Sequence, residues 1–133
     1  MEKIVVKGVE PKTVDLNDGL HIGKVVRLEQ RTPEGKDYTY LDVFIVPSGE
    51  VFEIKQGYNI PKNGVSSKTD LGKLIGRFKG RNIIPNESYD LNELLINRVV
   101  QFVTIKNQEG FVDINKESLK PSENQDQIVE ASE

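Results

Sequence analysis

The chain has 133 residues, a formal net charge of −3 and no cysteine. The missing cysteines exclude disulfides and thiolate metal sites, and a lone histidine, His21, disfavours a zinc site, which uses several Cys or His ligands. Residues 1–120 carry 18 basic and 17 acidic side chains, a net charge of +1, and the remaining four acids follow them. A nearly neutral body therefore precedes a negative tail.

Neither a membrane span nor a leader is evident in the hydrophobicity pattern. No stretch approaches the roughly 20 apolar residues that cross a bilayer, and the start lacks the apolar run of a signal peptide. We therefore expect a soluble protein of the cytoplasm, or of the host cytoplasm if the protein is viral. We predict one folded domain over residues 1–120, with residues 1–18 as an N-terminal extension. Residues 121–133 are predicted to be a disordered acidic tail, because they are too polar to bury a core.

The first half of the chain is typical of β-strands. His21 to Arg31 predicts a strand, and the doubled Val25-Val26 predicts a bulge because it breaks the alternation. Tyr38 to Val46 alternates most clearly. Leu41, Val43 and Ile45 are expected to face the core, whereas Tyr38, Tyr40, Asp42 and Phe44 face the other way. After a turn, Val51 to Gln56 predicts a third strand, and Gly57 to Gly64 a loop that carries Tyr58.

The second half combines a helix with two more strands. Apolar residues at i, i+3, i+4 and i+7 predict a helix over 66–79 that is capped by Ser66 or Ser67. Asp90 is expected to cap a short helical turn, and strands are expected over 98–106 and 111–114.

The order of these elements favours the OB-fold. Three strands, one helix and two strands predict a mainly β protein, a closed five-stranded antiparallel barrel with the helix between strands 3 and 4. An SH3-like barrel would not need the helix, and an α+β sandwich could use it equally well, so both remain as alternatives.

Four short motifs carry a resemblance to known proteins. They are Gly19-Leu-His21-Ile-Gly23-Lys24, Tyr38-x-Tyr40-Leu-Asp42-Val, the helical run from Ser67 to Phe78, and Val100-Gln-Phe102 with Gly110-Phe111-Val112. Across residues 19–120 the chain resembles phage and archaeal-virus proteins similar to single-stranded-DNA-binding OB proteins. The resemblance implies sequence-tolerant binding of single strands during replication or recombination. Bacterial single-strand-binding proteins also carry an acidic tail with a terminal Phe, whereas residues 128–133 here contain none.

The candidate binding residues lie on and around the second strand. Aromatic rings stack on bases without reading their sequence, and basic side chains contact phosphates. We expect stacking by one set of residues (Tyr38, Tyr40, Phe44 and Tyr58) and backbone contacts by another (Lys24, Arg27, Lys36 and Lys55). The expected partner is single-stranded DNA, with RNA as a second option.

Other interpretations stay open. The rings could instead fill a second small core under the N-terminal segment, and the barrel could serve as a protein-interaction or assembly module. The tail could compete with nucleic acid, recruit replication proteins or only add solubility, and a homo-oligomer is compatible with the sequence. We find no P-loop, nucleophile elbow or dinucleotide fingerprint, so we expect neither an enzyme nor a cofactor or metal.

Overall fold

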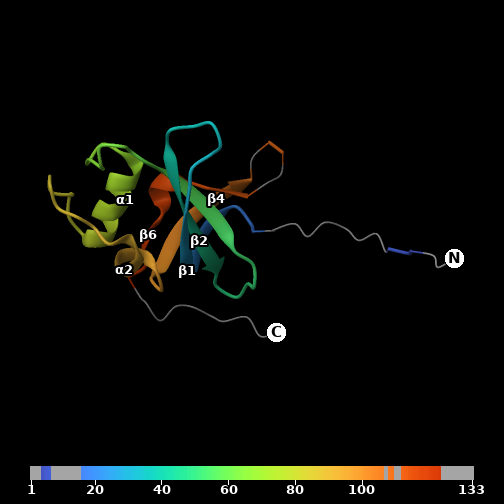
Figure 1. The fold of residues 1–133 in the computed structure, drawn as a ribbon. Coiled ribbons are helices and arrows are strands. Elements are labelled where there is room, and N and C mark those ends of the chain that lie inside the picture. The colour runs from blue at the N-terminus through green and yellow to red at the C-terminus, as the bar shows by residue number, and fades with distance from the viewer. Residues whose placement is uncertain (1–3, 7–15, 107, 110–111, 124–133) are drawn as a thin grey trace.

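The computed structural model describes residues 4–6, 16–106, 108–109 and 112–123. Its strands are β1 (Gly19–Arg31), β2 (Thr39–Pro47), β3 (Ile54–Ile60), β4 (Val99–Lys106), β5 (Val112–Ile114) and β6 (Lys120–Pro121). Its helices are α1 (Asp70–Lys79), α2 (Leu91–Leu95) and the 3-10 turn η1 (Lys116–Ser118). Figure 1 shows both α-helices on the same side of the curved sheet. The described residues contain no helix with the length and apolar character needed to cross a membrane.

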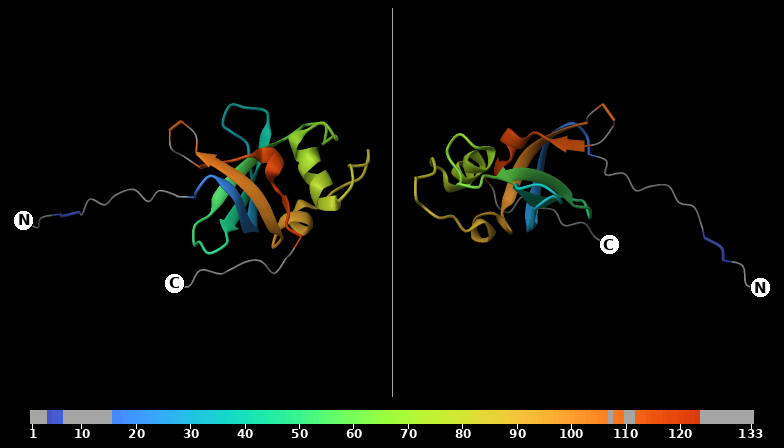
Figure 2. Two further views of the ribbon diagram at one scale, coloured as in Figure 1. Left: turned by 180° about the vertical axis from the view of Figure 1, so that it is seen from behind. Right: turned by 45° about the horizontal axis from the view of Figure 1, so that its top comes forward.

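All six strands form one antiparallel sheet, so the prediction of a mainly β fold is confirmed. Five strands follow the order β3-β2-β1-β4-β5, and β6 pairs with β4. β1 is the long central strand, because its first half pairs with β4 and its second half with β2 (Figure 2). The register shifts between Val25 and Arg27, which confirms the predicted bulge. This irregularity allows one strand to serve both halves of the sheet.

The sheet is not closed into a barrel, unlike the closed five-stranded barrel that the sequence predicts. Within the described residues, β3 and β5 end the strand path. β5 has three residues, which pair only with the last three residues of β4. From the inner side of β3, Tyr58 Oη donates a hydrogen bond of 3.3 Å to the Lys116 carbonyl of η1. Within the described residues, β3 therefore meets the C-terminal part of the chain through a side chain and not through strand pairing.

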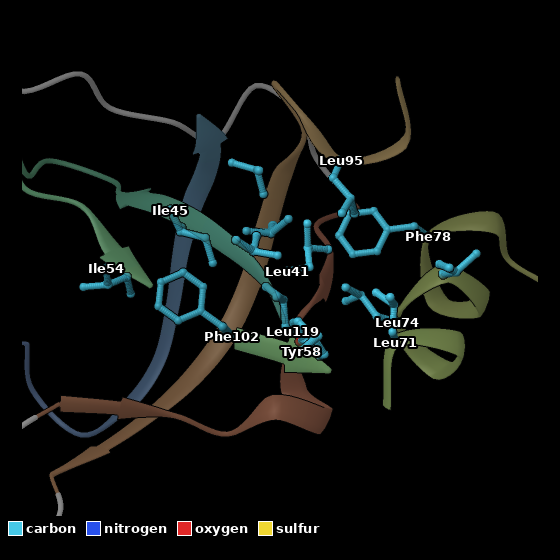
Figure 3. Packing of buried hydrophobic residues seen from close by; sticks show 14 of the residues in the cluster. Leu41, Ile45, Ile54, Tyr58, Leu71, Leu74, Phe78, Leu95, Phe102 and Leu119 are labelled. Atoms are coloured by element: carbon cyan, nitrogen blue, oxygen red, sulfur yellow. The ribbon is translucent and has the colours of Figure 1, made fainter. Parts of the chain in front are cut away.

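The core lies between the sheet and α1. The four apolar residues of the helical stripe are buried as predicted (Leu71, Leu74, Ile75 and Phe78). In Figure 3, Leu71, Leu74 and Phe78 point from α1 toward the sheet, where Tyr58 and Leu41 lie, and the ring of Phe102 lies farther from the helix, beside Ile45 and Ile54. Burial of this stripe by long-range packing stabilises a helix of only ten residues.

The helix begins later than the sequence predicts. α1 starts at Asp70, and its N-cap is Thr69, whose Oγ1 accepts a hydrogen bond from the Gly72 amide at 3.0 Å. The prediction of Ser66 or Ser67 as the cap was therefore wrong. The predicted cap of the short second helix is confirmed, since Asp90 Oδ1 accepts a hydrogen bond from the Glu93 amide at 3.2 Å.

The folded body includes the end of the predicted N-terminal extension and the start of the predicted tail. Leu16 is buried, and the Asn17 carbonyl accepts a hydrogen bond from Thr104 Oγ1 at 2.9 Å, although both residues fall within the predicted extension. Pro121 pairs with β4, and Ser122 is buried. Most of the predicted acidic tail, residues 124–133, lies outside the described residues.

Candidate nucleic-acid interface

One face of β1, β2 and β3 carries the aromatic rings that the sequence singles out. The strand register aligns three rows across this face, Arg27–Phe44–Lys55, Glu29–Asp42–Gly57 and Arg31–Tyr40–Asn59. The alternate residues Leu41, Val43 and Ile45 are buried on the opposite face, as predicted. We call the outer surface the aromatic–arginine face and define it by six residues: Arg27, Arg31, Tyr38, Tyr40, Phe44 and Lys55.

The rings of Tyr38, Tyr40 and Phe44 are half-buried, and each contacts a neighbouring side chain. The ring of Tyr38 meets that of Tyr40 edge-on, with centroids 5.2 Å apart and an interplanar angle of 82°. The guanidinium carbon of Arg27 lies 3.6 Å from the centroid of Phe44, and that of Arg31 lies 4.6 Å from the centroid of Tyr40. Ile4, Val5 and Val6 of the N-terminal segment are at least 82% exposed, so they do not pack over these rings. The rings therefore keep partial access to solvent beside the guanidinium groups of Arg27 and Arg31.

Arg27 is held in place over Phe44 by two carboxylates. Its Nε and Nη2 donate hydrogen bonds to both oxygens of Glu53 at 3.0 Å each, and Nη1 donates to Glu29. The hydrogen bond with Glu53 raises the pKa of Arg27 and lowers that of Glu53. The side chains of Arg27, Glu29 and Glu53 are each more than a third exposed, so water screens their attraction strongly.

Arg31 makes a different contact, with a buried carboxylate. Its Nε donates a hydrogen bond to Asp42 Oδ2 at 2.7 Å, and this bond raises the pKa of Arg31. The Asp42 side chain is 3% exposed, and its Oδ1 atom finds no hydrogen-bond partner among the described residues. Gly57 lies opposite Asp42, and a Cβ atom there would come within 3.2 Å of that oxygen. The glycine therefore leaves space for a carboxylate in the middle of the face.

Of the three predicted lysines, Lys55 belongs to this face, and Lys24 and Lys36 flank it. Lys55 is exposed and lies opposite Phe44, whereas Lys24 is half-buried on β1 and lies opposite Val46, one row beyond Phe44. Lys36 is exposed in the turn between β1 and β2. This turn follows the row that contains Arg31, so the cationic groups extend along the full length of the face.

Tyr58 does not belong to this surface, and its prediction as a stacking residue was wrong. The strand that was expected to end at Gln56 continues to Ile60 as β3, and Tyr58 lies opposite Leu41 on its inner side. The ring is fully buried. Burial also raises the pKa of its phenol. A base could stack on this ring only if the core opened.

The sequence did not point to two polar residues on or beside the face. Arg31 shares the parity of Arg27, so the period of two could have identified it. Asn59 is exposed opposite Tyr40, and it lies there because β3 continues past Gly57 instead of ending at Gln56. Among the described residues, no group of three His, Asp or Glu side chains could hold a metal ion.

Comparisons with known proteins give no family to which the chain can be assigned. No family model matches the sequence, and no curated protein matches it. The chemistry of the aromatic–arginine face is therefore the basis for a functional proposal.

Proposed function

We propose that the protein binds single-stranded nucleic acid, DNA in the first instance, across the aromatic–arginine face with little sequence preference. The observation that carries this proposal is the alternation of rings and cations on one outer surface: Phe44 lies between Arg27 and Lys55, and Tyr40 lies beside Arg31. Rings stack on any base, and guanidinium groups bind phosphates through several donors at once.

The energies involved favour exchange of the arginines for bases. An exposed cation–π contact contributes about 0.5–1 kcal/mol, whereas stacking of a base on an aromatic ring contributes about 1–3 kcal/mol. A base that replaces Arg27 over Phe44 therefore gains more than the ring loses. The released guanidinium can then contact the phosphate of the same nucleotide, since it stays on the neighbouring strand.

The strand order supports an OB-type architecture for this function. β1 pairs with both β2 and β4, and the helix α1 stands between β3 and β4 in the chain. OB-folds are partly open five-stranded barrels that bind ligands across their second and third strands. The proposed family remains that of phage and archaeal-virus proteins similar to single-stranded-DNA-binding OB proteins.

The acids on the same face favour one alternative, a protein-interaction or assembly module. Glu29, Asp42 and Glu53 lie among the rings, and each would repel a phosphate. In the free protein, however, Arg27 and Arg31 pair with all three. A protein partner with mixed charges would use these acids directly, so the two functions differ in their response to salt.

Titration of a labelled oligothymidylate with the full chain tests the proposal. We expect binding that weakens steeply with added salt, with a log–log slope of about −2 to −3 if three to four phosphates are neutralised. The Tyr38→Ala/Tyr40→Ala variant should bind at least tenfold more weakly, whereas the control Tyr89→Ala, which removes a ring outside the face, should bind normally. Absence of binding by the wild type would refute the function. Equal binding by both variants would refute only the site.

A further inference from the structure

A second cationic site lies beside α1, outside the aromatic–arginine face. A cavity of about 640 Å³ opens between α1, the turn that follows it and η1. Lys73, Arg77 and Arg81 line it at intervals of four residues, which places their side chains along one side of the helix and its exit. Ser67 and Asn82 add polar groups to the same wall.

Arg77 is positioned in this cavity by neutral groups. Its Nε donates a hydrogen bond to the Leu119 carbonyl at 2.7 Å, and its Nη2 donates to the Lys116 carbonyl at 3.1 Å. Arg27, Arg31 and Arg81, in contrast, each pair with a carboxylate. These two hydrogen bonds hold the guanidinium of Arg77 in one orientation. Among the described residues no carboxylate forms an ion pair with it, so its positive charge is not neutralised. A guanidinium held at two nitrogens still has donors on the third.

Helix electrostatics does not explain the whole set of cations. Arg77 lies in the last turn of α1, where a positive charge is favourable. Lys73 lies outside this last turn, and it stands four residues from Arg77, a spacing that is unfavourable for two like charges. The described residues provide no ion pair for Lys73. An anion in the cavity would compensate for this repulsion.

The nearby acids leave the cavity positive. Glu117 lines it, and Glu87 accepts a hydrogen bond from Arg81 at 2.6 Å. Lys116 and Asp70, on η1 and the first turn of α1, pair with each other at 3.7 Å. Three cations against two acids give a net charge of +1, which suits an anion of low charge rather than a long polyanion.

We infer that this cavity binds a phosphate group through Arg77, Lys73 and Arg81. Arginine presents planar donors that match phosphate oxygens, and lysine adds a point charge. The volume falls within the range of about 300–1,000 Å³ that is typical of small-ligand sites, so a nucleoside monophosphate fits. The phosphate belongs either to a free nucleotide or to the backbone of a strand. This inference does not depend on binding at the aromatic–arginine face.

Inorganic phosphate, titrated into the isotopically labelled full chain, tests the site by NMR. We expect saturable shifts of the Gly76, Gly80 and Asn82 amides. Lys73→Gln should weaken binding by at least threefold, and Arg77→Lys should weaken it further because it loses the planar donors. Lys79→Gln removes a cation from the same helix that does not line the cavity, so it should bind like the wild type.

The source of the phosphate and the independence of the site are tested in parallel arms. Shifts at the same amides with thymidine monophosphate alone would assign the cavity to free nucleotides, whereas shifts with a dithymidine phosphodiester would assign it to a strand. The Tyr38→Ala/Tyr40→Ala variant should retain the phosphate shifts whether or not it binds oligonucleotides. The inference is overturned if phosphate leaves the amides around the cavity unchanged, or if Lys73→Gln and Lys79→Gln weaken binding equally.

Discussion

The guanidinium carbon of Arg27 lies 3.6 Å from the centroid of the Phe44 ring. Two nitrogens of the same group donate to Glu53 at 3.0 Å each, so one side chain covers an aromatic ring and neutralises an acid. On the proposed function, a base that stacks on Phe44 would compete with Arg27 for the ring, and its phosphate would compete with Glu53 for the guanidinium of Arg27. This competition would set the affinity of the face for nucleic acid.

Removal of the competing acid should strengthen oligonucleotide binding. Glu53→Gln leaves Arg27 free to contact phosphate, and exposed ion pairs contribute only about 0.2–1 kcal/mol, which corresponds to a gain of roughly one- to fivefold. Glu50→Gln, in the neighbouring turn and outside the aromatic–arginine face, removes the same charge and should have a smaller effect. Fluorescence anisotropy at low salt measures both. Weaker binding by Glu53→Gln would mean that Glu53 positions Arg27 for the ligand.

Acid should weaken the ion pair between Arg27 and Glu53 and so lower the free energy of unfolding. The hydrogen bond from Arg27 lowers the pKa of Glu53, and the bond from Arg81 lowers that of Glu87. Each carboxylate then contributes stability that is present above its ordinary pKa of 4.5 and is lost as the pH falls through the lowered value. Urea unfolding from about pH 5 down to pH 2 should show this loss. The slope should decrease in Glu53→Gln and in Glu87→Gln, and an unchanged slope in both would contradict the two contacts.

The buried carboxylate of Asp42 should depend on Arg31. Arg31→Met leaves this carboxylate without its charged partner, and we expect a loss of about 1–3 kcal/mol in the free energy of unfolding. Asp42→Asn in the Arg31→Met background should restore part of that loss, because a neutral amide is less costly to bury than an unpaired charge. Denaturant unfolding of the two single variants and the double variant measures the coupling. Additive losses would show that the two side chains do not interact.

Tyr58 should matter for stability and not for binding. Tyr58→Phe removes the hydrogen bond to the Lys116 carbonyl from a fully buried ring, so we expect about 1 kcal/mol of destabilisation. Oligonucleotide affinity should stay unchanged. Because burial raises the pKa of this phenol, its contribution to stability is present below its ordinary pKa of 10.0 and is lost at higher pH. A large loss of affinity with unchanged stability would show that Tyr58 contributes to binding.

Gly23 should tolerate no larger residue. A Cβ atom there would lie 2.7 Å from Ile45 Cγ2 and 2.8 Å from the Val46 carbonyl oxygen, where β1 pairs with both of its neighbours. Gly23→Ala should therefore lower the free energy of unfolding by about 1–3 kcal/mol. Leu20→Ala, at an exposed position of the same strand, should change it by less than about 0.5 kcal/mol. A thermal unfolding midpoint that is equal in the two variants would contradict the close packing at Gly23.

Local patterns in the sequence were sufficient for several elements. The alternation of Tyr38 to Val46 identified both the buried and the outer sides of β2. In β1, the bulge followed from a single break in the alternation at Val25-Val26. The stripe that begins at Leu71 identified the buried side of α1. These features repeat every two or every three to four residues, so neighbours in the chain suffice to specify them.

Only the tertiary structure decided which of these side chains are available. Residues that meet across strands are distant in the chain: Arg27 meets Glu53, Arg31 meets Asp42, and Tyr58 reaches Lys116. The open sheet has the same origin, because in the described residues the three-residue strand β5 pairs only with β4 and not with β3, and no pattern within either strand specifies this. Periodicity determines the side of a strand on which a residue lies, whereas packing between distant segments determines what covers it.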